Sequence, residues 1–165
     1  MTKHTRIAAL ISAVSATMLL VTSCATVPKS VSPLPRSSEV TCVEPINLDY
    51  KYLAWGLGED NPAAEEDAVK AAVYTAMTSR GAGGCAPVMS TSEAMKNGEF
   101  IQTFFADGKW RQFATNTNRG RIDPNKRLKL EDGTIKLGID VVVNVSGLRQ
   151  YLTELGVIQS MRIGN

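Results

Sequence analysis

Residues 135–145 read IKLGIDVVVNV, and apolar side chains occupy every second position of this stretch. Strict alternation with a period of two predicts a β-strand that has one buried face. The other face carries Lys136, Asp140 and Asn144, which are polar and suit contact with water. The stretch therefore predicts a sheet that is covered on one side only.

A shorter alternating run precedes this strand. Leu128 and Leu130 alternate with charged residues, and Asp132-Gly133 separates the two runs. Two alternating apolar runs around Asp-Gly are a strong local signal for a β-hairpin. We therefore expect a meander of strands from Thr115 onward, with one apolar face.

A further strand is predicted over residues 52–57, YLAWGL. Its larger apolar residues, Leu53, Trp55 and Leu57, share one face. The opposite face is small at Ala54 and Gly56, which would let a helix approach the strand closely.

The next element is expected to be a long helix. Asn61 is a suitable N-cap, and Pro62 suits the first helical position. A stripe of mostly small apolar residues at helical spacing follows between residues 68 and 77. The acidic residues near the helix start would complement its positive end: Glu65, Glu66 and Asp67.

Residues 98–114 allow two structures. Phe100, Phe104 and Phe105 fall at helical spacing, whereas Asp107-Gly108 between aromatic runs is typical of a hairpin turn. We favour a helix that starts near Ser92, with the aromatic residues after Gly108 packing in a further turn.

The C-terminal residues predict a final helix, capped by Ser146 and ending at Gly156, and a short edge strand over residues 157–163. Strands and helices are segregated along the chain. The sequence therefore predicts a two-layer α+β domain, with an antiparallel sheet of about three to five strands and helices packed on one face.

The N-terminal residues have the layout of a secretory signal. Lys3 and Arg6 supply positive charge, residues 7–21 are largely apolar, and small residues precede Cys24. About fifteen apolar residues are too few to predict a spanning helix. The ending LLVTSC, residues 19–24, resembles a bacterial lipobox. This resemblance implies cleavage before Cys24 and attachment of lipid to that cysteine, which would anchor the chain firmly in a membrane.

The residues after Cys24 bear on sorting. Ala25 and Thr26 occupy the place where an Asp is the familiar signal for retention in the inner membrane. By analogy with other lipoproteins we expect an outer-membrane anchor, with the domain facing the periplasm. Exposure on the cell surface stays open.

We therefore divide the chain into a signal peptide (residues 1–23), a lipidated cysteine with a Pro- and Ser-rich tether (24–41), and a single α+β domain (42–165). At about 3.1 Å per residue in an extended form, the tether could hold the domain roughly 50 Å from the lipid.

Composition narrows the chemistry further. The chain has 18 basic and 16 acidic residues, and loss of Lys3 and Arg6 with the signal leaves 16 of each. A neutral envelope protein gives no support for nucleic-acid binding. The single histidine, His4, also leaves with the signal, so the mature chain has no Ser-His-Asp relay and no imidazole metal ligand.

With Cys24 acylated, Cys42 and Cys85 remain as an even pair in an oxidising compartment. A disulfide between them would enclose the first strand and helix of the domain. Two buried free thiols are the alternative, and a redox pair is disfavoured because the Cys-x-x-Cys spacing is absent.

The order of elements carries a second resemblance. The strand ending in Ala54-Trp55-Gly56-Leu57-Gly58 leads into an Ala-rich helix, and a long strand later feeds a Leu-rich helix. Over residues 50–156 this order resembles small outer-membrane lipoproteins of the twenty-kilodalton antigen type, and the N-terminal domains of some flagellar assembly proteins. It implies a fold and an envelope location, and no catalytic residue.

One group of charged residues is a candidate binding surface. This basic strip would contact anionic lipid, lipopolysaccharide or the acidic face of a partner. A charged strand edge that discourages aggregation is the simpler explanation. The strip consists of Arg119, Arg121, Lys126, Arg127 and Lys129.

No nucleophile motif, metal-ligand pattern or cofactor fingerprint is present in the mature chain. We expect a non-catalytic, membrane-anchored envelope lipoprotein that serves as a structural or protein-interaction module. The alternative is a lipoprotein that binds a small molecule or glycan through the aromatic residues Phe100, Phe104, Phe105 and Trp110. A third possibility is a histidine-free glycan hydrolase, which would need two facing carboxylates in a cleft.

Overall fold

The computed structural model describes residues 32–79, 81–118 and 120–159. Residues 1–31 lie outside the described residues, and they include the predicted signal peptide, Cys24 and the first part of the predicted tether. Arg80, Arg119 and residues 160–165 also lie outside the described residues. The strands are β1 (Val40–Ile46), β2 (Asp49–Gly58), β3 (Ala114–Asn116), β4 (Arg127–Lys129) and β5 (Ile135–Val143). The helices are α1 (Asn61–Thr78), α2 (Thr91–Lys96), α3 (Gly98–Ala106) and α4 (Val145–Glu154), with short 3-10 helices η1 (Lys109–Phe113) and η2 (Pro124–Lys126).

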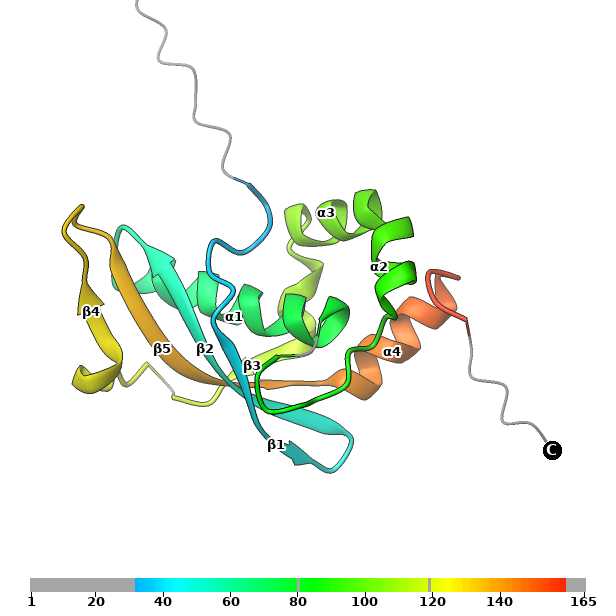
Figure 1. Ribbon diagram of the computed structural model, residues 1–165, viewed down its shortest axis with the longest axis horizontal. Coiled ribbons are helices and arrows are strands. Elements are labelled where there is room, and N and C mark those ends of the chain that lie inside the picture. Colours follow the sequence, from blue (N-terminus) through cyan, green and yellow to red (C-terminus); the bar gives the residue numbers. More distant parts are fainter. Residues whose placement is uncertain (1–31, 80, 119, 160–165) are drawn as a thin grey trace, which may run out of the picture. The chain divides into compact units, whose positions relative to one another are not determined.

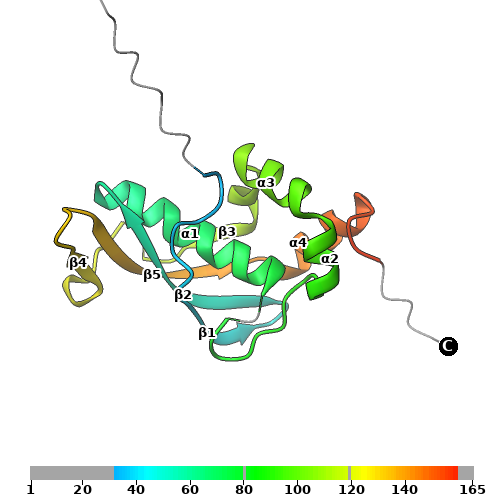
Figure 2. The same cartoon turned by 45° about the horizontal axis from the view of Figure 1, so that its top comes forward.

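The strands form one antiparallel sheet in the order β1-β2-β5-β3, and β4 pairs with a different part of β5. Helix α1 covers one face of the sheet, while α2, α3 and α4 gather near the end at which β5 leads into α4 (Figures 1 and 2). This arrangement confirms the predicted α+β class. Among the described residues, no helix is long and apolar enough to cross a membrane.

Strand β5 keeps the predicted alternation, because Ile135, Leu137, Ile139, Val141 and Val143 are buried towards α1. Lys136, Asp140 and Val142 are half-buried on the opposite face, called here the outer face. The strand ends at Val143, two residues earlier than expected. Asn144 caps α4 instead, and its Oδ1 accepts a hydrogen bond from the Gly147 amide at 2.7 Å. Ser146, which we expected to be the cap, therefore lies in the first turn of the helix.

Helix α1 lies directly on β2, and small residues make this approach possible. A Cβ atom at Gly56 would overlap the carbonyl oxygen of Ala64 and the amide nitrogen of Ala68. The predicted small face of this strand is therefore the face that meets the helix. The N-cap is Asp60 rather than Asn61, because the Asp60 carboxylate accepts a hydrogen bond from the Ala63 amide at 2.8 Å.

Asp67 is buried against the sheet, with only 6% of its surface exposed. Its Oδ1 accepts a hydrogen bond from the Arg36 amide at 2.7 Å. Its Oδ2 accepts bonds from the amides of Leu57 at 2.9 Å and Ser37 at 3.3 Å. We expected this carboxylate to complement the positive N-terminal end of the helix, and that expectation was wrong. One side chain joins α1, the end of β2 and the segment before β1.

The folded domain begins before the boundary that we expected at Cys42. Strand β1 starts at Val40, Leu34 packs against the core, and Ser37 is buried. Residues 34–41 therefore belong to the domain and not to the predicted tether.

The middle segment is helical and contains no hairpin. Helix α2 begins with a capping box, in which the Ser90 hydroxyl and the Glu93 carboxylate each bond to the other residue's amide. Two hydrogen bonds lower the pKa of the Glu93 carboxyl below its usual value. The bond from the Ser90 hydroxyl has the larger effect, and the bond from the Ser90 amide adds to it. Helix α3 follows from Gly98, and Gly108, with φ of 71°, turns the chain into η1.

The hairpin at Asp132-Gly133 is present, and the Leu130 amide donates to the Thr134 carbonyl oxygen at 2.8 Å. Leu128, however, is 48% exposed. The register places it opposite Lys136, which lies on the outer face, so its side chain shares that solvated face. The predicted edge strand at the C-terminus is not formed up to Gln159, and its remaining residues lie outside the described part of the chain.

Cys42 and Cys85 lie at disulfide distance, with their Cα atoms 5.9 Å apart. The loop that carries Cys85 also runs beside the start of β1, where the Ala82 amide donates to the Val40 carbonyl oxygen at 3.2 Å. The cysteine pair therefore holds this loop against the edge of the sheet.

We expect Asp67→Asn to lower the free energy of unfolding by about 1–3 kcal/mol, because an amide cannot accept all the bonds that the carboxylate accepts. Urea unfolding measures this loss. Trypsin should also cleave faster after Arg36, because the segment before β1 loses its attachment. The exposed Glu131 provides a control. Its side chain forms no hydrogen bond with a described residue, so Glu131→Gln removes only a charge. Equal stability and cleavage in both variants would contradict this role of Asp67.

The cysteine pair gives a second test. In Cys24→Ala protein purified without reductant, we expect iodoacetamide to label Cys42 and Cys85 only after reduction. The pair spans 43 residues, so the double variant Cys42→Ser/Cys85→Ser should be less stable by up to about 4 kcal/mol. Mass spectrometry and urea unfolding give the two readouts. Labelling before reduction would show free thiols.

Candidate binding site at the interrupted sheet edge

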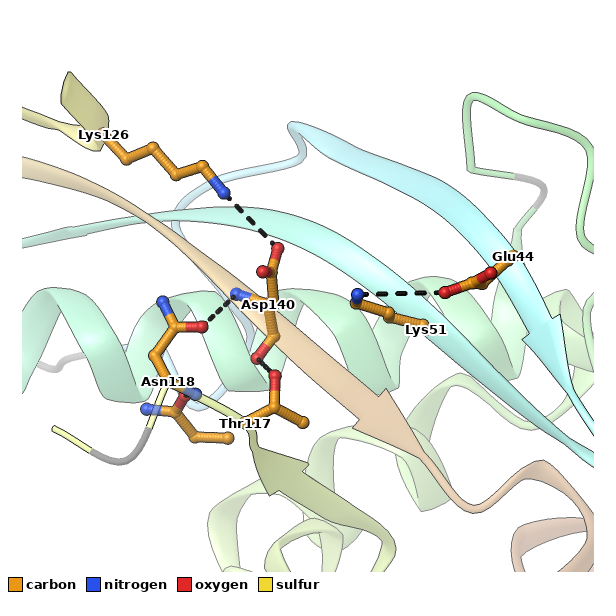
Figure 3. Close-up of polar contacts among 7 residues, drawn as sticks. Glu44, Lys51, Thr117, Asn118, Lys126 and Asp140 are labelled. Carbon is orange, nitrogen blue, oxygen red and sulfur yellow. Dashed lines mark hydrogen bonds and ion pairs between the residues drawn. The ribbon is translucent and has the colours of Figure 1, made fainter. Parts of the chain in front are cut away.

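The edge of β5 away from β2 is paired with two short strands that leave a gap between them. Strand β3 pairs with residues 141–143, and β4 pairs with residues 135–137. In the gap, the Asp140 carbonyl oxygen accepts hydrogen bonds from the Thr117 amide and hydroxyl, each at 3.0 Å. The Asp140 amide donates to Asn118 Oδ1 at 3.3 Å. Thr117 and Asn118 thus take the place of a strand at this point (Figure 3).

The loop leaves the sheet because its sequence suits turns. Gly120 has φ of 75°, a conformation that glycine adopts most readily. Asp123 accepts a hydrogen bond from the Asn125 amide at 2.9 Å, and Pro124 begins η2. The chain can rejoin β5 only after this short helix, at Arg127.

A polar cavity of about 600 Å³ lies against the gap. This volume falls within the range of about 300–1,000 Å³ that is common for ligand sites. The side chains around it come from the loop and from β5: Thr117, Asn118, Arg121, Asp123, Lys126 and Asp140. The cavity therefore gathers two cations and two carboxylates beside neutral polar groups.

The charges in the cavity are only loosely paired. Lys126 Nζ lies 3.5 Å from Asp140 Oδ1, and each side chain is 30% exposed. Such a part-exposed pair contributes at most about 1 kcal/mol to stability, so a ligand or partner can displace it. Arg121 forms no ion pair with any described residue, which leaves its charge available.

A second pair extends this charged surface across the outer face. Lys51 of β2 lies 3.8 Å from Glu44 of β1. Figure 3 shows the two pairs, Lys126–Asp140 and Lys51–Glu44, one beyond the other over β5, β2 and β1. Charges of alternating sign therefore run from the loop to the first strand.

The structure divides the basic strip. Arg121 and Lys126 meet at the cavity, whereas Arg127 Nε donates to Asn61 Oδ1 at 2.8 Å, at the start of α1. Lys129 is opposite Ile135 and so lies on the α1 side of the sheet. Arg119 is outside the described residues. No single surface holds all the described members of the strip.

Several groups around the cavity already take part in hydrogen bonds or an ion pair within the fold. The Thr117 hydroxyl donates to the Asp140 backbone carbonyl oxygen at 3.0 Å. Asp123 is engaged in capping η2, and Asp140 faces Lys126. Within the described residues, no group of three or more metal-ligating side chains lies together.

The aromatic middle segment lies in the core, although Trp110 also lines a shallow pocket of about 390 Å³ beside α1. Phe104, Phe105 and Trp110 are each no more than 3% exposed, and Phe100 packs against the same core. Arg111 stacks over the Trp110 ring at 4.6 Å and pairs with Glu66 at 2.9 Å. These rings stabilise the fold and present no broad face to a ligand.

Sequence reasoning found only part of this cavity. Asp140 was recognisable as a polar residue on the solvated face of its strand. Asn144 was assigned to the same face of that strand, but it caps α4. Thr117 and Asn118 carry no sequence signal for their role, because they act only where β5 has no strand partner.

The polar cavity is assembled from two parts of the chain. Its parts come from β5 and from a loop that replaces an edge strand, and each wall residue is common on protein surfaces. Comparison of the chain with family models, with curated proteins and with solved structures finds no match.

Proposed function

We propose that this protein is a non-catalytic lipoprotein of the bacterial cell envelope, anchored through a lipidated Cys24, whose α+β domain binds another envelope component. The observation that carries the proposal is the ending LLVTSC of the apolar N-terminal segment, residues 19–24. Several acyl chains on one cysteine would hold the protein in a membrane, since each buried methylene contributes about 0.8 kcal/mol.

The way in which the chain enters the domain supports an anchored protein. The amides of Arg36 and Ser37 bond to the buried Asp67 carboxylate, so the first domain residues are fixed to α1. A tether limited to residues 24–33 would span about 30 Å in an extended form. The domain would then work close to the membrane surface.

The exposed polar cavity supports a binding role. Arg121 and Lys126 offer positive charge beside the Asp123 and Asp140 carboxylates, which suits a partner surface that carries both signs. The residues after Cys24 favour the outer membrane and the periplasmic face, as the sequence suggests. A partner in the periplasm or the cell wall would meet the domain there.

Replacement of Cys24 tests the anchor. We expect Cys24→Ala to abolish labelling by radioactive palmitate and to move the protein from the membrane fraction to the soluble fraction. Thr26→Ala, two residues away, should keep the label and the membrane location. Wild-type protein that takes up no palmitate and fractionates as soluble would contradict the proposal.

Photo-crosslinking tests the binding surface. A photoreactive residue in place of Arg121 should give a discrete adduct with an envelope component in intact cells. The same residue in place of Lys129 is a matched control, because this basic residue lies on the opposite side of the sheet. Equal adducts at both positions would contradict the cavity as the binding surface. Loss of the Arg121 adduct in Cys24→Ala would link binding to the anchor.

A further inference from the structure

The polar cavity beside the gap in β5 presents charges of both signs. Arg121 and Lys126 supply two cations. Asp123 and Asp140 supply two carboxylates. Among the described residues around the cavity, Ile122 is the one apolar side chain. Most ligand pockets are largely apolar, so that burial of apolar surface provides much of their affinity. A ligand of this cavity must instead be held by charge and hydrogen bonds.

The mixture of charges disfavours a simple ion as the ligand. An anion drawn to Arg121 or Lys126 would also lie near two carboxylates, and a cation drawn to the carboxylates would lie near two cations. Like charges brought together in a binding site cost affinity. A group that carries both signs can instead meet an opposite charge on each side. The balance of charge in the cavity therefore selects a zwitterion.

The ion pair in the cavity shows how closely the two signs lie. Lys126 Nζ is 3.5 Å from Asp140 Oδ1, which is long for a hydrogen bond between charged groups. Figure 3 shows that the two side chains approach from different elements, Lys126 from η2 and Asp140 from β5. An α-amino acid carries its ammonium and its carboxylate on one carbon, so its two charges also lie within ion-pair distance. Such a group matches the spacing of charges in the cavity.

We propose that the polar cavity binds an amino-acid group whose α-ammonium and α-carboxylate are both free. The ligand carboxylate accepts hydrogen bonds from the planar guanidinium of Arg121 and from Lys126, and the ligand ammonium donates to Asp140. An alternating set of four charged groups then replaces one loose ion pair. This inference rests on the binding role in the proposed function and deepens it, because it names the group of the envelope component that the cavity recognises.

The backbone of the site can stay in place when the ligand enters. Asp140 holds the loop through its main chain, because its carbonyl oxygen accepts bonds from Thr117 and its amide donates to Asn118 Oδ1. Its carboxylate takes no part in these bonds and pairs with Lys126. The side chain can therefore turn to a ligand, or be replaced, while the loop keeps its attachment. The cavity of about 600 Å³ is larger than one amino-acid group, so a longer component can extend from it.

NMR titration of purified Cys24→Ala protein tests the proposal, with alanine as the probe. We expect alanine to shift the amide signals of Thr117, Asn118 and Asp140 and the side-chain signal of Arg121. Two matched controls each carry one of the two charges, since N-acetylalanine is an anion and alaninamide is a cation. Each control should bind on the order of tenfold more weakly than alanine, because one charge-assisted contact is lost. Equal binding of the three compounds, or no shift with alanine, would overturn the proposal.

Variants that remove one charge make the test specific to the site. Arg121→Gln should weaken alanine binding on the order of tenfold, since a bidentate contact is lost. Asp140→Asn should weaken alanine binding by a similar factor and strengthen the binding of N-acetylalanine, because it removes an opposing carboxylate and frees Lys126. The matched control is Lys51→Gln, which removes a paired cation from the same outer face outside the cavity. Thermal unfolding checks that each variant is folded. An Asp140→Asn variant that keeps its preference for alanine would overturn the assignment.

The outcome separates from those of the proposed function. Alanine binding by a protein that takes up no palmitate in cells would keep the amino-acid site and reject the anchor. A discrete adduct at Arg121 in cells, without alanine binding by the purified protein, would keep the binding surface and reject the amino-acid group as its ligand.

Discussion

The structure depends on the close approach of α1 to β2. At Gly56 no Cβ atom fits between strand and helix, and the residues of α1 that face it are alanines. Because the two backbones are so close, the short side chain of Asp67 can reach the amide of Leu57 and the segment before β1. A helix held further away by larger side chains would leave that carboxylate without partners in a buried position, which is unfavourable. The close packing and the buried carboxylate therefore require each other.

This constraint explains what the sequence could and could not predict. Hydrophobic periodicity gave β5, β2 and α1 and the α+β class, because alternation and helical spacing are local properties of the chain. The N-caps of α1 and α4 were predicted too late in the chain. Asp60 and Asn144 are the caps, and each has another good cap residue close after it. Asp67 was misread because its partners are distant in sequence, at Arg36 and Ser37. Leu128 was misread because only the register decides which face it shares.

The candidate site was predictable in composition and not in geometry. A cluster of basic residues was visible in the sequence, but the sheet separates them, since Arg127 and Lys129 lie opposite Leu137 and Ile135 on the α1 side. Arg121 and Lys126 reach the outer face from the loop, where the gap in the edge of β5 brings them to Asp140. That gap arises from a non-local event, the pairing of two short strands with one long strand. Local sequence patterns carry no information about it.

The balance of positive and negative charge sets the distance over which this domain can attract a charged partner. Residues 24–165 carry 16 basic and 16 acidic residues, and on the outer face the paired charges alternate in sign. Fields from such pairs cancel within a few ångströms, and salt at physiological strength screens the remainder beyond about 8 Å. Long-range attraction then contributes little to bringing a partner to the cavity. The membrane anchor that we propose would compensate for this weak long-range field, because confinement raises the effective concentration of a partner.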